Sequence, residues 1–338
     1  MDMKRSLQIC FYLPLCGLLV WFLVDAAEVR CTVSEALALC AGSVIPALFP
    51  FLAVSSLLVS LDFGQWLSPC FSGLMSSLFH LPGPAGSALL LGLAAGYPVG
   101  AKTAADLYRS GLLTRAEAER LLTFCNNSNP VFLISVLGSG VFDSTRAGLW
   151  LWLIHIASAL LTGLLFRGHG TGGPFQQTRP PALSPAPSFS GAFVAAVKSA
   201  AGAMLSICAF VTLFYVLSSP LARLSSPFGP LLTGALELFS LTPQLSPDQT
   251  GFLLAAGCAG WGGVSVLCQT ASVLEGNGLS LRPCFFGKLT QGLLSLLLAA
   301  LLSRYVLFKE LNKTQEDYLK EFFRKKGNGP LFLSIFRK

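Results

Sequence analysis

The stretch Pro84–Phe142 reads PAGSALLLGLAAGYPVGAKTAADLYRSGLLTRAEAERLLTFCNNSNPVFLISVLGSGVF. Its two apolar runs, Ser87–Ala95 and Val131–Leu137, each border a cluster that a lipid-facing helix avoids: Gly96-Tyr97-Pro98-Val99-Gly100 and Asn126-Asn127-Ser128-Asn129-Pro130. Proline lacks a backbone N–H and clashes with the preceding turn, so both clusters predict helix breaks. At membrane depth, breaks are tolerated only where the freed groups face protein or water. Transporters use such breaks to present backbone groups to a solute.

The composition indicates a membrane protein. Hydrophobic residues make up 53% of the 338 residues and charged residues 12%, and the mean hydropathy is +0.66. Several apolar runs approach the ~20 residues that span a bilayer. We therefore expect an all-α, polytopic protein whose first partner is the lipid bilayer. The net charge of +7 lies mostly in loops and the C-terminal tail, where cations set membrane topology, so nucleic acid is not an expected partner.

The sequence offers no pattern of an enzyme. The chain has ten cysteines but no CxxC pair, and most of them lie in apolar runs as small hydrophobic residues. Its three histidines share no metal-ligand spacing, and no Walker lysine follows a Gly-rich loop. We therefore expect no enzymatic activity, no catalytic residue, no cofactor and no metal site.

The N-terminal run Leu7–Val24 follows Lys4 and Arg5. It reads either as a cleavable signal or as an uncleaved first transmembrane helix, and the many later spans favour the second. The positive-inside rule then predicts a cytoplasmic N-terminus and an external loop from Asp25 to Glu35. The basic C-terminal tail is also expected in the cytoplasm, either on anionic lipid or as a solvated anchor.

Four further features of the sequence lead to predictions. Pro46 and Pro50 interrupt the apolar run Ala36–Leu61, which predicts a kinked or partly unwound span. The run Asp62–Leu81 suits a short interfacial helix. The charged segment Lys102–Arg120 is expected at an aqueous surface, and Thr114 with Glu117 forms a capping box there. A single His155 inside an apolar span is expected to be a packing residue rather than a ligand.

The second part of the chain echoes the first. Residues Gly111–Phe124 match Gly278–Gln291 at five of fourteen positions. The Gly-rich break Gly260–Gly263 stands where the first half has Gly96–Gly100. This order of elements predicts an internal duplication. The predicted parts are residues 1–35 (N-terminal helix and external loop), 36–166 (first half), 167–190 (Gly/Pro-rich linker), 191–308 (second half) and 309–338 (basic tail).

Three motifs carry a resemblance to a known family: GYPVGAK at Gly96–Lys102, LYRSGLLTRAEAERLLTFCNNSNPVFL at Leu107–Leu133, and the segment around Trp261. They resemble the sporulation integral membrane proteins of the YlbJ type, within the group that shares the nucleoside-recognition (Gate) domain. The resemblance covers roughly residues 40–308. It implies two Gate-like halves, a transport or gating fold, a role in sporulation, sporulation membrane proteins as partners, and a place in the cytoplasmic or forespore membrane. Cys268 stands where relatives often carry His.

The candidate solute site follows from the polar residues at membrane depth. Amides and hydroxyls suit an uncharged polar solute, such as a nucleoside or another small metabolite. The same groups alternatively hydrogen-bond between helices, an alternative favoured for Thr270. The predicted substrate-binding residues are Asn126, Asn127, Ser128, Asn129, Glu237, Ser265 and Gln269, and the predicted helix-break residues are Gly96, Pro98, Gly100, Pro130, Gly262 and Gly263.

Glu237 lies in the apolar setting GALELFSL. An ionised carboxylate at the membrane centre costs roughly 2.5–3.5 kcal/mol on insertion scales, so we expect it to be paired, protonated or beside a watery cavity. It is a candidate for coupling proton or sodium movement to transport, and the alternative is an interfacial position near Pro243 and Pro247. The competing hypothesis for the whole protein is a non-transporting membrane scaffold of a spore-formation complex.

Overall fold

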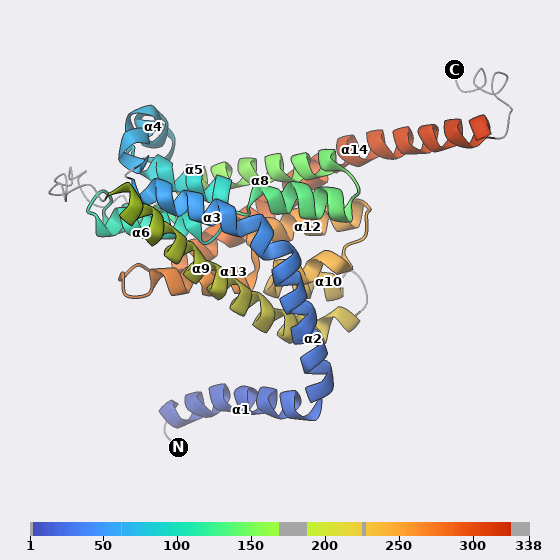
Figure 1. Cartoon of the computed structure of the whole chain (residues 1–338), viewed down its shortest axis with the longest axis horizontal. Coiled ribbons are helices and arrows are strands. Elements are labelled where there is room, and N and C mark those ends of the chain that lie inside the picture. Colours follow the sequence, from blue (N-terminus) through green and yellow to red (C-terminus); the bar gives the residue numbers. More distant parts are fainter. Residues whose placement is uncertain (1–2, 62, 169–187, 225–227, 326–338) are drawn as a thin grey trace.

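The computed structural model describes residues 3–61, 63–168, 188–224 and 228–325. All regular elements in these ranges are helices, which confirms the all-α prediction. Five helical stretches are long and apolar enough to cross a membrane: Ala26–Leu58, Thr145–Leu165, Phe189–Ser218, Gln249–Leu274 and Arg282–Ser303. Thr145–Leu165 and Arg282–Ser303 run roughly along the long axis of one bundle, Phe189–Ser218 crosses it obliquely, and the first part of Ala26–Leu58 bends away from it (Figure 1).

The N-terminal part differs from its prediction. Helix α1 (Met3–Val24) lies apart from the bundle (Figure 1). The expected external loop from Asp25 to Glu35 is instead helix α2 (Ala26–Leu39), so that expectation was wrong. Its Ala, Glu and Leu residues are strong helix formers, and they outweigh the charges that suggested a loop.

A π-helical turn, η1 (Cys40–Val44), connects α2 to α3 (Ile45–Ser60). The turn comes directly before Pro46, whose missing N–H and bulky ring disturb a regular α-helical turn at this point. The predicted distortion of this span is therefore a local widening of the helix rather than an interruption. The next helix, α4 (Phe63–Phe79), covers the predicted interfacial segment.

Helices α5 (Ala85–Ala95) and α6 (Val99–Arg109) form a tight hairpin around Gly96, Tyr97 and Pro98. Two glycines allow the hairpin to close over the carbonyl oxygen of Cys125. A Cβ atom at Gly92 would lie 1.7 Å from this oxygen, and one at Gly100 would lie 2.0 Å from it. Any side chain larger than hydrogen at either position would therefore displace the backbone.

The charged segment Lys102–Arg120 spans most of α6 and helix α7 (Arg115–Leu121), and the predicted capping box of Thr114 and Glu117 is confirmed. The chain then runs without regular structure to Asn129 before the π-helix η2 (Phe132–Val141) and helix α8 (Thr145–Leu165). The predicted linker, residues 167–190, falls largely outside the described residues.

The second half begins with α9 (Phe189–Ser218). A series of short elements follows: η3 (Leu221–Arg223), α10 (Phe228–Leu236), α11 (Leu238–Leu241) and η4 (Thr242–Gln244). Helices α12 (Gln249–Trp261) and α13 (Gly263–Leu274) are separated by Gly262, which has the positive φ of 86° that favours glycine.

The last helix, α14 (Arg282–Lys325), is longer than expected. It begins at Arg282, shortly after a turn in which Gly276 and Gly278 have positive φ. The helix also continues past the bundle into the predicted basic tail (Figure 1). The first part of the predicted tail is therefore helical and continues the last span.

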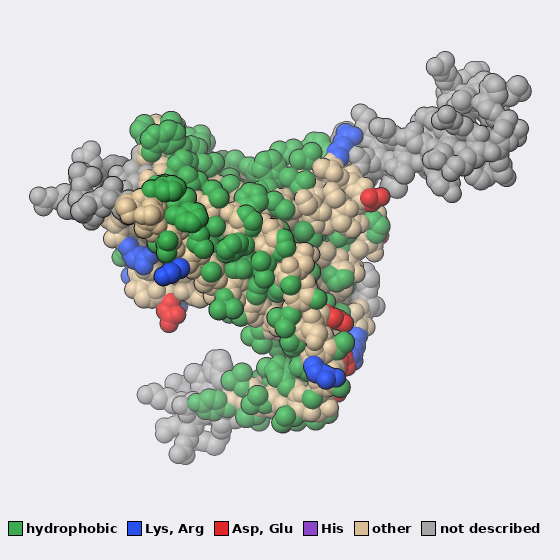
Figure 2. Space-filling model, viewed as in Figure 1, with side chains coloured by type: hydrophobic (Ala, Val, Ile, Leu, Met, Phe, Trp, Pro, Cys, Tyr) green, Lys and Arg blue, Asp and Glu red, His purple; other side chains and the backbone are tan. Residues whose placement is uncertain are grey.

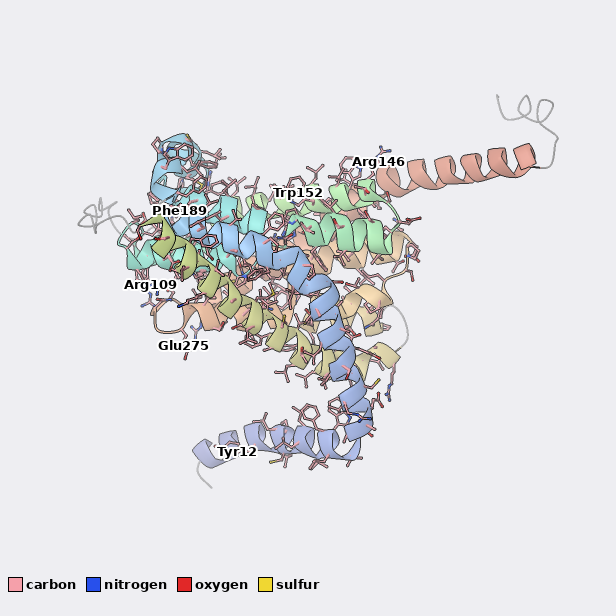
Figure 3. The ribbon with its side chains drawn as sticks, in the orientation of Figure 1. Tyr12, Arg109, Arg146, Trp152, Phe189 and Glu275 are labelled. Atoms are coloured by element: carbon pink, nitrogen blue, oxygen red, sulfur yellow. The ribbon has the colours of Figure 1, made fainter. Side chains whose placement is uncertain are left out.

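Charged side chains gather at the two ends of the bundle, and apolar side chains dominate the visible middle (Figure 2). Arg109 and Glu275 lie toward one end, together with Phe189 at the start of α9, while Arg146 lies toward the other end (Figure 3). Helix α14 leaves the bundle at the end opposite to the start of α1 (Figure 1). The predicted cytoplasmic placement of both termini stays a prediction.

The predicted duplication and its alignment of the two Gly-rich breaks stay predictions. Gly96 in the α5–α6 hairpin packs on Asn129, since a Cβ at Gly96 would lie 2.9 Å from the Cβ of Asn129. Gly263 packs in the same way on Leu236 and Glu237, between α10 and α11. Both glycine breaks therefore pack against another interruption of the bundle. The long helices α3 and α9 run in opposite directions (Figure 1), as in an inverted repeat.

Candidate functional site

Four helix interruptions meet in the interior of the bundle. They are Gly96–Pro98, Asn126–Asn129, Glu237 between α10 and α11, and Gly262 between α12 and α13. Tyr97 and Ser128 link the first two through their hydroxyls at 3.4 Å. The rings of Phe132 and Phe239 pack 4.6 Å apart between the second and the third. The predicted candidate residues thus lie around one centre, although they come from distant parts of the chain.

Each interruption leaves a backbone carbonyl without its helical donor, and a side chain from another element replaces that donor. In a regular helix, the carbonyl of Asn126 would accept from the N–H of residue 130, which is a proline. Four such pairs are present: Asn129 Nδ2 to Ala95 O at 3.0 Å, Lys288 Nζ to Asn126 O at 3.1 Å, Ser128 Oγ to Ala259 O at 3.3 Å, and Trp261 Nε1 to Ala235 O at 2.9 Å. Three of these donors come from another interruption, and the fourth, Lys288, comes from α14.

The asparagine segment is fully buried, with each of its side chains at most 3% exposed. Asn127 donates to Phe124 O at 2.8 Å and accepts from Gln291 Nε2 at 2.9 Å. Asn129 donates to Ala95 O and accepts from the N–H of Val131 at 2.7 Å. Both amides are thus occupied by protein partners, which favours a role in holding the break closed over a direct solute contact in this conformation.

Asn126 differs from its neighbours. Its Nδ2 donates to Thr270 Oγ1 at 2.8 Å, but its buried Oδ1 has no hydrogen-bond partner among the residues that the structure describes. The predicted helix-bonding role of Thr270 agrees with this contact. A buried amide oxygen without a partner carries a desolvation cost, so it is a ready acceptor for a polar solute or a water molecule.

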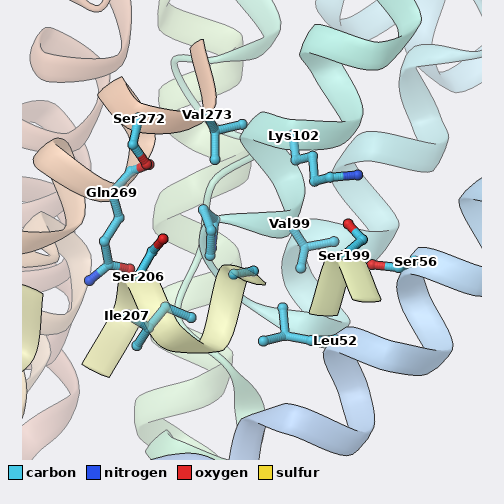
Figure 4. A pocket seen from close by; sticks show the side chains of 12 residues that line it. Leu52, Ser56, Val99, Lys102, Ser199, Ser206, Ile207, Gln269, Ser272 and Val273 are labelled. Carbon is cyan, nitrogen blue, oxygen red and sulfur yellow. The ribbon is translucent and has the colours of Figure 1, made fainter. Parts of the chain in front are cut away.

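The predicted pair Ser265 and Gln269 lies on one face of α13, and Gln269 Nε2 donates to Ser265 Oγ at 3.3 Å. The Oε1 of Gln269 is buried and accepts no hydrogen bond within the described part of the chain. Gln269 borders a cavity between α3, α6, α9 and α13, with Lys102 and four serines on its walls: Ser56, Ser199, Ser206 and Ser272 (Figure 4). Lys102 also forms an ion pair with Asp106, at 3.3 Å.

This cavity encloses about 50 Å³. Such a volume holds one or a few water molecules, whereas sites for drug-sized ligands measure roughly 300–1,000 Å³. The bundle is therefore closed around the site, and a nucleoside-sized solute needs helix movement to enter.

Glu237 is 2% exposed and lies at the interruption between α10 and α11. Its Oε2 accepts from the N–H of Ser240 at 2.6 Å and from Ser240 Oγ at 3.0 Å, so the carboxylate caps the N-terminus of α11. A Cβ at Gly263 would lie 3.3 Å from the Cα of Glu237. The acid is thus buried beside the α12–α13 break.

The sequence analysis did not single out Lys288 and Gln291. Lys288 is 1% exposed, and its Nζ contacts Gln291 Oε1 at 2.9 Å as well as Asn126 O. His155 Nε2 accepts from the N–H of Ser128 at 3.0 Å, which is possible for a neutral imidazole. A lysine inside an apolar span indicates a functional site. Lys288 follows Gly287 inside such a span, so this pattern could have singled it out.

We expect Trp261→Phe to lower the stability of the protein by about 1 kcal/mol, because Ala235 O loses its donor in a buried setting. Trp152→Phe is the matched control. The Trp152 indole N–H is buried without a partner, so its removal should be neutral or stabilising. Thermal unfolding of the two purified variants in the same detergent measures the difference. Equal unfolding temperatures would contradict the capping role of Trp261.

Comparisons with known proteins agree with the resemblance. Residues 41–145 match the Gate family model, described as nucleoside recognition. The chain is also similar to the sporulation integral membrane protein YlbJ of Bacillus subtilis (strain 168), at 29% identity over 301 residues, which cover 77% of this chain and 74% of the relative. No solved structure matches the chain significantly. The predicted resemblance to the YlbJ type and the Gate group is thereby confirmed, and the chain is an integral, multi-pass membrane protein.

Proposed function

We propose that this protein is a transporter or gated pore for a small polar solute, such as a nucleoside or another metabolite, and that it acts during sporulation. The observation that carries the proposal is the convergence of four helix interruptions, whose freed carbonyls are capped by side chains that can exchange partners. Broken helices that meet inside a bundle are the usual site of solute and ion binding in secondary transporters. The sporulation role is transferred from the YlbJ relative.

Within this proposal, Gln269 and Asn126 contact the solute. Their amide oxygens are buried without protein partners, and Gln269 borders the closed cavity. Asn127 and Asn129 shape the break, while Glu237 couples transport to a proton or to sodium. The end of the bundle that carries Arg109 faces the cytoplasm, because Lys102, Arg109 and Arg115 lie near it. The membrane is the cytoplasmic or forespore membrane.

Flux into proteoliposomes tests the proposal, with a panel of nucleosides, small metabolites and divalent metals. For the solute that wild type carries, we expect Gln269→Leu to reduce flux about tenfold, the effect of one lost hydrogen bond to a buried group. The variant should unfold close to the wild-type temperature, since leucine removes an unsatisfied acceptor but also the long hydrogen bond to Ser265 Oγ. Gln249→Leu, at the exposed start of α12, is the matched control and should leave flux unchanged.

The transporter hypothesis and the scaffold hypothesis predict opposite results for flux and for sporulation. A scaffold would show no flux for any solute of the panel, and cells with Gln269→Leu would still sporulate normally. A transporter should lose both the flux and the sporulation efficiency with this change while the protein is still inserted. Reduced stability with unchanged flux would assign Gln269 to helix packing.

A further inference from the structure

Lys288 is a buried cation beside the broken helix of the first half. It lies on α14, is 1% exposed, and points its Nζ at two oxygen atoms: Asn126 O at 3.1 Å and Gln291 Oε1 at 2.9 Å. Among the side chains that the structure describes, no carboxylate forms an ion pair with it. A lysine with this burial and without a counter-ion is costly to insert, so its charge has a specific task.

The position of its two acceptors indicates that task. Pro130 has no N–H and cannot donate a hydrogen bond to Asn126 O. Lys288, on another helix, donates to this carbonyl instead. In broken-helix transporters, unwound carbonyls of this kind coordinate the coupling cation. Gln291 extends the contact, because its Nε2 donates to Asn127 Oδ1 at 2.9 Å. The ammonium therefore bridges the break to α14.

The same lysine also contacts the interruption at Gly262, between α12 and α13. A Cβ at Gly262 would lie 3.5 Å from the Cε of Lys288, so the stem of the lysine packs on the interruption between α12 and α13. Glu237 lies against the other side of that break, at Gly263. One covalently attached cation thus holds elements of both halves together.

We propose that the Lys288 ammonium is a built-in cation that takes the place of a bound metal ion at the broken helices. Closure of the bundle then needs no sodium. This inference deepens the proposed function, because it removes sodium from the two coupling ions considered for Glu237 and leaves the proton. The ammonium site itself does not depend on transport and is tested separately from it.

The experiment is thermal unfolding of the full-length protein in detergent, in sodium chloride and in choline chloride of equal ionic strength. We expect the wild-type unfolding temperature to be the same in both salts. Lys288→Met keeps the apolar stem but removes the charge and the donor, and should unfold about 5 °C lower or more. Lys198→Met changes an exposed lysine on α9 and should match wild type.

Two outcomes would overturn the inference. A wild-type protein that sodium stabilises by several degrees over choline has a separate cation site, and this result does not require any variant to fold. Lys288→Met at the wild-type unfolding temperature would show that the ammonium is dispensable at the break. In the proteoliposomes, replacing sodium by choline should leave flux unchanged. Absence of any flux would contradict the proposed function but not the ammonium site.

Discussion

A valine at position 92 should prevent the chain from folding. In the α5–α6 hairpin, a Cβ at Gly92 would lie 1.7 Å from the carbonyl oxygen of Cys125 and 3.1 Å from the Cα of Gly100. Both are backbone atoms, so no side-chain rotation relieves the clash. Ordinary overpacking costs about 1–3 kcal/mol, and displacing the hairpin from the Asn126–Asn129 segment should raise the cost of Gly92→Val to about 4 kcal/mol or more.

The measurement is the amount of monodisperse protein extracted from membranes, by size-exclusion chromatography of a fluorescent fusion. The matched control is Gly202→Val on α9, where a Cβ has no heavy atom within 4 Å. Both changes place the same β-branched residue inside an apolar helix, so they differ only in the space around it. Equal yields of the two variants would show that the hairpin does not pack on Cys125 as described.

Glu237→Gln should abolish solute accumulation in proteoliposomes while the protein stays folded. The glutamine Oε1 can still accept from the N–H of Ser240, so the cap of α11 is kept and the stability should change by no more than about 1 kcal/mol. The charge and the proton-binding capacity are lost. If Glu237 couples transport to an ion, accumulation should fall at least about a hundredfold, toward the background of empty vesicles.

Glu28→Gln is the control for this change. Glu28 is an exposed acid that pairs with Arg223 at the surface, where an ion pair contributes little. Its flux should equal that of wild type. Normal accumulation by Glu237→Gln would restrict Glu237 to capping α11, and the coupling part of the proposal would then fail while the solute site would remain.

The two predictions examine different properties of the same centre. Gly92 lets the hairpin approach the asparagine segment, so it is needed in every conformation that keeps this contact. The caps on the freed carbonyls are single hydrogen bonds between elements, and membrane hydrogen bonds of this kind contribute roughly 0.6 kcal/mol on average. Their exchange during opening is therefore inexpensive, while the tight glycine contacts preserve the shape of the hairpin.

The sequence was sufficient for the class of the protein and for the position of its breaks. High hydropathy with few charges requires helices in a bilayer, because lipid offers no partners for free backbone groups. Proline and glycine clusters mark interruptions through local sterics alone, and α5 ends at Ala95 while α6 begins at Val99, around the predicted cluster. The capping box at Thr114 is equally local.

The tertiary structure decided which groups face each other, since contacts between distant segments leave no local pattern in the chain. Nothing in the neighbourhood of Lys288 or Trp261 indicates that they cap Asn126 O and Ala235 O. Asn127 and Asn129 looked like the best solute contacts, yet the fold uses both amides and leaves only Asn126 Oδ1 and Gln269 Oε1 without partners in the predicted set. Local chemistry thus determined where the helices break, and packing determined which polar atoms remain for a solute.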